Sequence, residues 1–269
     1  MKISIVTPTY NSAATIINNV NSVLSQTYSD FEHILIDNES NDNTIDIAKN
    51  EYAGKNLIEK LQIIREKDNG IAEAFNKGIE LADGEIIGIL NSDDKFYDET
   101  VFGKVINAFE DDNILYVHGN IYFDDKRYGS NIRKPLMCPV TRALPFNHPT
   151  MFFRKQVYLV FGLYDTDYKY SMDFEFICRI IKQVDDFYKK GVYLKGDPVV
   201  IMSAGGASWA NELDSIRETK RALKQHGFWN FDAKKNYAFR VCRTKTKSIL
   251  EYLKADNVVK LWRKIKWRN

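Results

Sequence analysis

Cysteine is scarce in this sequence. Three cysteines occur among 269 residues, they lie far apart, and neither a CxxC pair nor a His/Cys cluster accompanies them. A disulfide scaffold needs an even set of cysteines, and a thiolate zinc site needs paired ones. Both are therefore excluded as organising features, and we expect reduced thiols in a cytoplasmic location.

Long apolar runs are also missing. No run approaches the ~20 residues that a membrane-spanning helix requires. The first residues, MKISIVTPTY, lack the apolar core of a signal peptide. We therefore expect a chain that does not cross a membrane.

Two common phosphate-binding loops are absent as well. The sequence has no GxGxxG after its first apolar segment and no GxxxxGK[ST] anywhere. Both loops bring backbone N–H groups close to a phosphate. A phosphorylated ligand would therefore need another partner, such as a divalent cation held by carboxylates.

The chain has almost no overall net charge, but its charges are unevenly placed. The formal net charge is +2, whereas residues 240–269 contain ten Lys/Arg and two Asp/Glu, which leaves −6 for residues 1–239. The basic end favours an anionic partner. Nucleic acid is not the expected partner, because the acidic body would oppose its binding.

The first half of the sequence alternates regularly between two kinds of apolar segment. Short apolar runs of strand length alternate with segments whose apolar residues have helical spacing. Short links between such elements imply parallel strands with helices on both faces. The expected strands are 2–8, 33–38, 61–67, 85–90 and 114–120, and the expected helices are 11–26, 40–52, 71–82 and 99–110.

The second half is less regular. We expect a strand running into a helix at 150–155, a helix over 171–183, and at least one strand before the segment SAGGASW at 203–209. That glycine-rich segment is interpreted either as a lid over a bound ligand or as a tight turn. From about residue 211 the chain is expected to be helical.

Polar residues follow four of the predicted strands. The carboxyl ends of parallel strands meet at one edge of a sheet, and ligands bind in the crevice there. We therefore expect these side chains to share one site. They are Thr7, Pro8, Thr9 and Tyr10; Asp37 and Asn38; Asp68, Asn69 and Gly70; and Asn91, Ser92, Asp93 and Asp94.

Asp93 and Asp94 are adjacent carboxylates at the end of an apolar strand, where their charges repel each other. A loop with a helix cap is the plain explanation for such a pair. The alternative is a site for Mg²⁺ or Mn²⁺, which are held by one or two carboxylates together with substrate phosphates. The other polar strand ends favour the cation site.

Five motifs in order resemble those of the family 2 glycosyltransferases. The resemblance covers roughly residues 2–210 and is strongest to the bacterial branch that builds O-antigen and other surface polysaccharides. It implies an α/β fold of the GT-A (Rossmann-like) type, a mostly parallel sheet flanked by helices. The motifs are SIVTPTYNSAATIINNVNSVLSQTY, LIDNESNDNT, EKDNGIAEAFNKGI, ADGEIIGILNSDD and SMDFEFICRI.

The resemblance also implies a division of the chain. A catalytic domain is expected over 1–210, with a nucleotide-sugar-binding half at 1–120 and a half at 121–210 that supplies the acceptor site and the base. Asp37 would bind the uracil, and Asp68 would lie near the base and ribose. Asn91 would position the ribose or a metal-bound water. The implied nucleotide-sugar-binding residues are Thr7, Pro8, Thr9, Tyr10, Asp37, Asp68, Gly70, Asn76, Asn91, Ser92, Asp93 and His148. Packing alone explains Asn76 equally well.

The implied reaction is transfer of a hexosyl or N-acetylhexosaminyl group, with inversion, from a UDP-sugar to a hydroxyl of a glycan or lipid-linked glycan. Asp93 and Asp94 would hold Mn²⁺ or Mg²⁺, although the family's first metal-motif Asp is here Asn91. Asp173 is the expected general base, while the helix dipole alone would also favour an Asp there. The alternatives are a nucleotidyltransferase and a non-catalytic subunit that binds a nucleotide sugar.

Residues 211–269 are expected to form a helical, basic and amphipathic extension. Apolar residues recur at helical spacing within 239–253, and NVVKLWRKIKWRN places apolar side chains on one face and cations around the other. Such a helix suits the surface of an anionic bilayer. We therefore expect residues 240–269 to contact the inner face of the cytoplasmic membrane, with packing on the protein body as the alternative.

Overall fold

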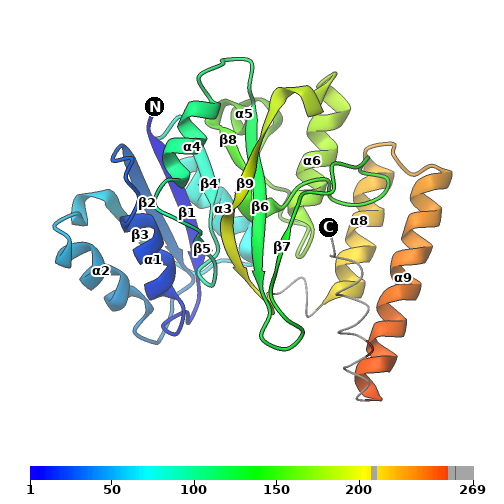
Figure 1. Ribbon diagram of the computed structural model, residues 1–269, viewed down its shortest axis with the longest axis horizontal. Helices are drawn as coiled ribbons and strands as arrows, with labels where there is room; N and C mark the ends of the chain where they lie inside the picture. The colour runs from blue at the N-terminus through cyan, green and yellow to red at the C-terminus, as the bar shows by residue number, and fades with distance from the viewer. Residues whose placement is uncertain (207–210, 254–257, 259–269) are drawn as a thin grey trace.

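The computed structural model describes residues 1–206, 211–253 and 258. Its centre is one curled sheet with the strand order β3-β2-β1-β4-β8-β6-β9-β5, and β7 pairs with β6 (Figure 1). The strands are β1 (Ile3–Thr9), β2 (Phe31–Asp37), β3 (Leu61–Arg65), β4 (Ile86–Ile89), β5 (Lys95–Phe96), β6 (Tyr116–Asp124), β7 (Asn131–Arg133), β8 (Phe152–Arg154) and β9 (Gly191–Ser203).

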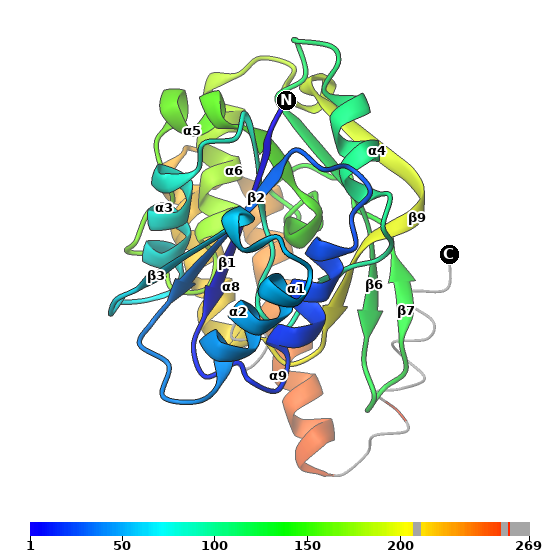
Figure 2. The ribbon, with the colours of Figure 1, turned by 90° about the vertical axis from the view of Figure 1, so that its left-hand side faces the viewer.

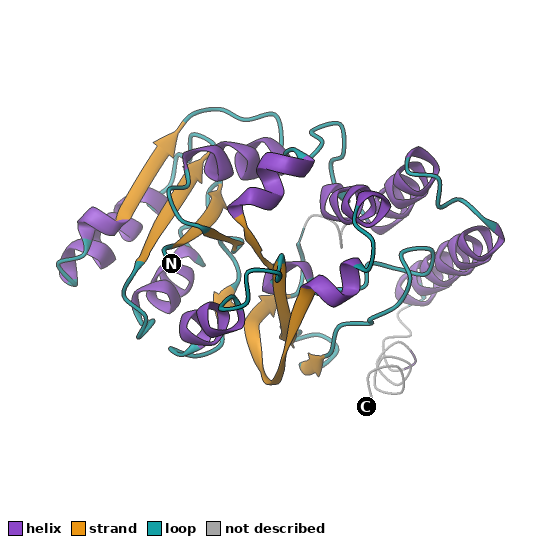
Figure 3. Ribbon diagram, turned by 90° about the horizontal axis from the view of Figure 1, so that it is seen from above, coloured by secondary structure: helices purple, strands orange, loops and turns teal. Residues whose placement is uncertain are grey.

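Helices cover both faces of this sheet, as Figure 3 shows from above. They are α1 (Ile16–Leu24), α2 (Thr44–Gly54), α3 (Ile71–Leu81), α4 (Val101–Ala108), α5 (Lys155–Phe161), α6 (Met172–Gln183), α8 (Glu212–Gln225) and α9 (Phe231–Tyr252), with short 3₁₀ turns at Ile58–Lys60, His148–Thr150 and Phe187–Lys190. The fold is therefore the expected α/β arrangement of a sheet between helices.

The first four strands of the sheet confirm the prediction of parallel pairing. β1 lies between β2 and β4 and is parallel to both, and β3 extends the row beside β2. β1 and β2 are buried along almost their whole length, which explains why they read as continuous apolar runs. All four carboxyl ends consequently meet at one edge of the sheet.

The second half of the sheet departs from simple alternation. β8 is antiparallel to both of its neighbours, β4 and β6. β9 is one long strand that pairs parallel to β6 and antiparallel to β5. The mostly parallel sheet therefore carries an antiparallel insertion whose position depends on contacts between distant parts of the chain.

Apolar side chains of alternating strand residues pack on opposite faces. On one face, Ile3 and Ile5 pack with α4, and α1 and α2 lie side by side (Figure 2). On the other face, Val6 and Ile34 belong to the large core that includes α3, α5 and α6. Because successive side chains of a strand point to opposite faces of the sheet, helices can pack on both faces.

Helix α1 begins later than expected. Residues 11–26 were predicted as one helix, but the helix starts at Ile16 and Thr15 occupies its N-cap position. Asn11 has a φ of 49°, and its side chain accepts a hydrogen bond from the backbone N–H of Asn41 at 2.9 Å. The predicted start of the helix was wrong because Asn11 links two neighbouring loops instead.

The C-terminal helices α8 and α9 pack against each other, and α8 also packs on α6 (Figure 1). Glu212 of α8 forms ion pairs with Arg243 at 3.3 Å and Lys247 at 3.1 Å. Two of the basic side chains at this end are therefore paired with an acidic side chain of the protein itself. The expected boundary between residues 210 and 211 stays a prediction, although α8 contacts the preceding domain.

No helix in the described part of the chain is both long enough and apolar enough to cross a bilayer. The apolar positions predicted at Leu261, Trp262 and Ile265 lie outside the described residues, as do residues 207–209 of the glycine-rich segment.

Candidate active site

A cavity of about 560 Å³ opens at the carboxyl ends of β1 and β4, and we call it the strand-end cavity. It gathers residues from all four predicted polar strand ends. Its lining includes Pro8, Thr9, Tyr10, Asn11, Ser12, Asn38, Asp68, Gly70, Asn91, Ser92, Asp93 and Gly206. The structure therefore brings most of the residues predicted at these strand ends together.

The entry to α3 shapes one side of this cavity. Asp68 accepts a hydrogen bond from the backbone N–H of Gly70 at 3.0 Å, and burial raises the pKa of the Asp68 carboxyl. Gly70 has a φ of 149°, which residues with side chains rarely adopt, and a Cβ there would meet no atom of the residues that the structure describes within 4 Å. The space above Gly70 is thus open for a ligand to approach the backbone.

The turn after β4 places Asn91, Asp93 and Asp94. Asp94 N–H donates to the Asn91 carbonyl at 2.9 Å. The amide of buried Asn19, on α1, donates to the carbonyls of Asn91 at 2.9 Å and Asp94 at 3.2 Å. The hydroxyl groups of Ser92 and Ser12 lie 2.8 Å apart. A helix on one face of the sheet therefore fixes the conformation of this acidic turn.

Asp94 is the more buried of the two carboxylates, with 2% of its surface exposed. Burial, together with the charge of Asp93, raises the pKa of Asp94 to about 7. Hydrogen bonds from Ser203 N–H at 2.9 Å and from the Asn91 amide at 3.3 Å oppose this rise. Burial also raises the pKa of Asp93. The pair therefore resists carrying two negative charges without a compensating cation.

A second cavity of about 150 Å³, the α6 cavity, continues from Asp93 toward the start of α6. Asp173 lies in the first turn of α6 and is half-buried in the wall of this cavity. Its Oδ1 accepts a hydrogen bond from the backbone N–H of Phe174 at 2.7 Å. Asp93 and Asp173 thus line one cavity, although 80 positions of the sequence separate them.

His148 lines the same cavity. Its Nε2 lies 3.3 Å from the hydroxyl of Tyr164, and its ring lies 6.0 Å from that of Phe75. Burial lowers the pKa of His148, and the nearby Asp173 charge opposes this shift. His148 is therefore held as a neutral imidazole beside the carboxylate.

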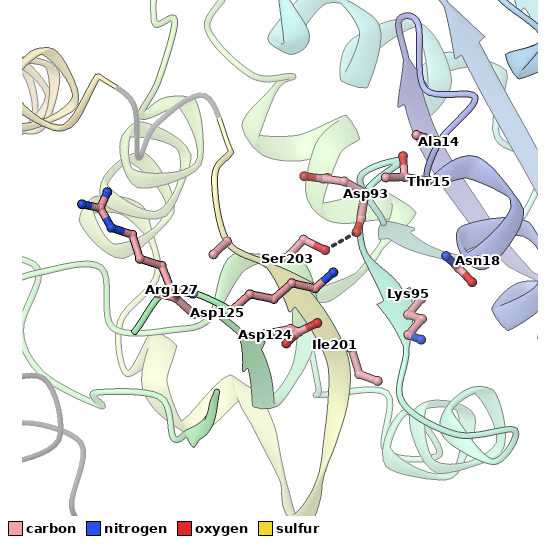
Figure 4. A pocket seen from close by; sticks show the side chains of 12 residues that line it. Ala14, Thr15, Asn18, Asp93, Lys95, Asp124, Asp125, Arg127, Ile201 and Ser203 are labelled. Atoms are coloured by element: carbon pink, nitrogen blue, oxygen red, sulfur yellow. Dashed lines mark hydrogen bonds between the residues drawn. The ribbon is translucent and has the colours of Figure 1, made fainter. Parts of the chain in front are cut away.

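A third cavity of about 550 Å³, the α1 cavity, lies on the other side of Asp93. Figure 4 shows Asp93 between Thr15, the N-cap residue of α1, and Ser203 at the end of β9. The Ser203 hydroxyl donates to the Asp93 carbonyl at 2.7 Å. Asp93 consequently lies where three cavities meet, and the end of β9 separates two of them.

Thr7 does not present its side chain to the strand-end cavity as predicted. It is fully buried, and its hydroxyl lies 2.9 Å from Nε2 of His33. Nδ1 of His33 lies 2.8 Å from the Tyr52 hydroxyl on α2. Thr7 therefore belongs to a buried hydrogen-bonded chain between β1, β2 and α2.

Asp37 also has a supporting position. It is fully buried, and its carboxylate accepts hydrogen bonds from the Thr9 hydroxyl at 2.8 Å and from the Ser40 N–H at 3.0 Å. Arg65 forms an ion pair with it at 3.3 Å. The predicted contact with uracil needs correction, because these protein groups already occupy both carboxylate oxygens. The neighbouring Asn38 lines the cavity instead.

Asn76 and Gly78 pack within the protein. The Asn76 amide donates to the Tyr164 carbonyl at 2.8 Å and accepts from the Tyr164 N–H at 2.9 Å. A Cβ on Gly78 would lie 2.2 Å from Cγ1 of Val6. The predicted ligand contact of Asn76 is therefore replaced by a link between α3 and the loop that precedes α6.

Glu175, two positions beyond Asp173, does not line the α6 cavity. It is buried and pairs with Arg179 of its own helix. Its Oε1 also lies 2.8 Å from Nε2 of His226. Arg179 therefore forms a salt bridge within the protein.

The residues around Asp93 fit a divalent cation of the hard, oxygen-binding class. Oδ1 of Asn91 is buried and has no hydrogen-bond partner among the described residues, and it lies next to two carboxylates of raised pKa. Among the residues that the structure describes, no cluster of three or more His, Cys, Asp or Glu side chains could hold a metal ion alone. This donor set suits a cation that also takes oxygens from a substrate phosphate.

Sequence reasoning missed several residues that build this site. Asn19 shapes the acidic turn, and Lys169 and Tyr170 line the α6 cavity. Asn19 left a weak signal, since a buried polar residue stands within the apolar face of α1. The others left none, because their roles depend on contacts across the fold.

The fold and the acidic strand end define a class of α/β proteins with a polar site at the carboxyl ends of parallel strands, and the comparisons with known proteins specify the family. Residues 4–173 match the model of "Glycosyl transferase family 2". The chain therefore belongs to this glycosyltransferase family, and its fold is the GT-A type.

Curated relatives are glycosyltransferases. A "PGL/p-HBAD biosynthesis glycosyltransferase" of Mycobacterium tuberculosis is 32% identical over 182 residues, which are 65% of this chain and 68% of the relative. GlyG of Streptococcus pneumoniae is 34% identical over 128 residues, 48% of this chain and 42% of GlyG.

Solved structures share the fold at low sequence identity. TarS of S. aureus in complex with UDP-GlcNAc has a TM-score of 0.66 at 17% identity, covering 83% of this chain and 66% of TarS 1-349. The mannosyltransferase PcManGT of Pyrobaculum calidifontis, with GDP-Man and Mn²⁺, has a TM-score of 0.61 at 17% identity, covering 97% and 87%. The present chain spans about two thirds of the length of TarS 1-349 and of the mycobacterial relative.

Proposed function

We propose that this glycosyltransferase moves a hexosyl or N-acetylhexosaminyl group, with inversion, from a UDP-sugar to a hydroxyl of a glycan or lipid-linked glycan acceptor. The pathway would be bacterial polysaccharide synthesis of the O-antigen type. The observation that carries the proposal is the position of Asp93, where the strand-end cavity meets the α6 cavity with Asp173 in its wall.

The strand-end cavity suits the nucleotide. Its volume of about 560 Å³ is of the size that takes a drug-sized ligand. Tyr10 is 61% exposed at its edge and offers an aromatic face, while Asn38 and Asp68 offer polar contacts. TarS, which has been solved with UDP and with UDP-GlcNAc, supports UDP as the nucleotide.

Asp93 would hold a divalent cation, with Asp94 and Oδ1 of Asn91 beside it. Bound Mn²⁺ or Mg²⁺ would stabilise the negative charge of the leaving diphosphate as a Lewis acid. Asn91 lowers the negative charge of the site by one relative to an Asp-x-Asp motif. The neutral amide reduces repulsion within the buried turn at the expense of cation affinity.

Asp173 would act as the general base. The acceptor hydroxyl gives its proton to the Asp173 carboxylate while its oxygen forms a bond to the anomeric carbon. The bond from that carbon to the diphosphate oxygen breaks on the opposite face, and UDP departs. His148, held neutral beside Asp173, can bind a sugar hydroxyl, and Lys169 and Tyr170 complete the acceptor side.

A screen of nucleotide sugars with Mn²⁺ tests this function. We expect UDP-sugars to raise the melting temperature, and we expect UDP release in the presence of acceptor glycans to stop with EDTA or in Asp93→Ala. A nucleotidyltransferase would instead release pyrophosphate from a nucleoside triphosphate and a sugar phosphate. A non-catalytic subunit would bind the donor without turnover across all acceptors.

We also propose that the C-terminal end lies on the inner face of the cytoplasmic membrane. Phe239 and Ile249 on α9 are 66% and 59% exposed, and Leu253, just after the end of α9, is 65% exposed. Exposed apolar side chains with nearby lysines suit an anionic bilayer. Flotation with anionic vesicles should recover the full chain. A triple variant with Ser at these three positions should remain unbound, and equal flotation of the two proteins would overturn the proposal.

A further inference from the structure

The loop that leads into α6 is held by a helix that lies outside the region matched by the family model. That model ends at residue 173, whereas α8 begins at Glu212. The carboxylate of Glu218, on α8, accepts hydrogen bonds from three successive backbone N–H groups. These belong to Lys169 at 2.9 Å, Tyr170 at 2.8 Å and Ser171 at 2.8 Å.

Neighbouring residues of α8 extend this contact along the loop. The hydroxyl of Ser171 donates to the Ser215 carbonyl at 3.1 Å. The hydroxyl of Tyr168 donates to Gln225 at 2.9 Å, and the guanidinium of Arg221 lies 4.2 Å from the centre of the Tyr168 ring. The loop over 168–171 is therefore fixed at every residue to one helix.

This loop forms the acceptor side of the site. Lys169, Tyr170, Met172 and Asp173 all line the α6 cavity. Backbone N–H groups just before and within the first turn of a helix have no partner inside the helix. A single carboxylate that accepts three such groups therefore decides both the path of the loop and the direction in which α6 starts.

We propose that Glu218 is a positioning residue of the transfer reaction, which sets the place of Asp173 and of the acceptor wall without touching substrate. This inference rests on the proposed function. A general base must reach the acceptor hydroxyl at hydrogen-bond distance, and a misplacement of about 1 Å can cost about 10²-fold in rate. Charge-assisted hydrogen bonds are roughly twice as strong as neutral ones, so the carboxylate suits this role.

The test compares Glu218→Ala and Glu218→Gln with Glu212→Gln. Glu212 lies on the same helix but pairs with α9, so its variant controls for lost charge and helix packing. We expect Glu218→Ala to lower kcat at least tenfold and to raise the acceptor KM. The donor KM and the Kd for UDP should stay within about twofold. Glu218→Gln should recover part of kcat, because its single amide oxygen still accepts hydrogen bonds.

Hydrogen exchange supplies a readout that needs no activity. In Glu218→Ala the amides over 169–173 should exchange faster, while those of β1 and β4 should be unchanged. Wild-type kinetics in Glu218→Ala, or unchanged exchange in this loop, would overturn the proposal. A general loss of protection would also overturn it, since Glu218 would then serve stability alone. A wild-type protein that transfers no sugar would refute the proposed function, and hydrogen exchange would still test the contact.

Discussion

The site has two walls whose residues are supported differently. The strand-end wall includes Asn38, Asp68 and Asp93, and the α6 wall includes Lys169, Tyr170 and Asp173. Along the strand-end wall, the polar residues lie at the carboxyl ends of one parallel row of strands, and Asn19 of α1 and Ser203 of β9 support the acidic turn there. Along the α6 wall, Asp173 and the loop before it depend on α8, which follows more than forty residues later along the chain. The position of the strand-end wall therefore depends on the sheet, and the position of the α6 wall depends on how α8 packs.

This difference suggests a division of labour. A parallel sheet whose strands are buried on both faces gives the nucleotide a rigid surface. A loop held by side chains from another helix can change with that helix, and it can accept different acceptors without disturbing the sheet. Acceptor specificity should therefore depend on the second half of the chain and on α8, while nucleotide binding should depend on the first half.

The largest expected effect separates the two walls directly. Asp173→Asn keeps the shape of the side chain but cannot take a proton from the acceptor. We expect kcat to fall about 10²- to 10⁴-fold, while UDP-sugar affinity measured by calorimetry stays within twofold. Asp167→Asn is the matched control, because Asp167 is an exposed partner of Arg221 outside the α6 cavity. Full transfer activity in Asp173→Asn would refute the role of Asp173 as base.

An intermediate effect concerns the support of the strand-end wall. Burial lowers the pKa of His33 from 6.5 to about 3, so the folded protein keeps this ring neutral while the unfolded chain takes up a proton below pH 6.5. The free energy of unfolding must therefore fall as the pH falls from about 6.5 toward 3. Between pH 6.5 and about pH 4.5, the protonation of His33 in the unfolded chain lowers the free energy of unfolding by on the order of 2 kcal/mol.

Urea unfolding at both pH values checks this prediction. In His33→Gln the loss on acidification should be smaller than in the wild type by about that amount. Tyr52→Phe removes the hydrogen bond to His33 but no group that titrates in this range, so it should keep the wild-type loss. Other buried histidines contribute equally to all three proteins. An identical loss in His33→Gln and in the wild type would show that this buried chain does not make the strand-end wall acid-sensitive.

The sequence predicted the two walls unequally. The alternation of strands and helices predicted the parallel row and the strand ends that meet at Asp93, because these follow from local periodicity. It did not predict that β8 enters the sheet antiparallel, that Asp37 and Thr7 face inward, or that Asn76 bonds to the loop at Tyr164. These features depend on hydrogen-bond partners that lie far apart in the chain. The spacing of residues in the sequence does not predict such partners.

The same reason explains the unexpected role of α8. Glu218 stands in a charged helix of ordinary composition, and only the folded chain places its carboxylate against three backbone N–H groups. Asp173 was predicted by its resemblance to a family motif. Its support lies beyond that motif, so it can differ among relatives that share the motif.

The smallest expected effect returns to the acidic turn, where both walls meet. Asn91→Asp adds a carboxylate next to Asp93 and Asp94, at the place where Oδ1 of Asn91 has no hydrogen-bond partner in the described part of the chain. A unit charge about 4 Å from a divalent cation attracts it by several kcal/mol at an effective dielectric constant of about 20. Repulsion among three carboxylates and the burial of one more charge offset most of this gain, so we expect Mn²⁺ to bind about tenfold more tightly.

Calorimetric titration with Mn²⁺ alone and with UDP measures this change without relying on turnover. Asn18→Asp is the control, since Asn18 is exposed on the wall of the α1 cavity and its variant has the same net charge. A long-range effect of charge would tighten binding equally in both variants, whereas direct participation of position 91 tightens it only in Asn91→Asp. Equal Mn²⁺ affinity of Asn91→Asp and the wild type would mean that the cation does not reach position 91. The cation would then be held from the side of Asp93 alone, and the site would depend on the substrate diphosphate for most of its ligands.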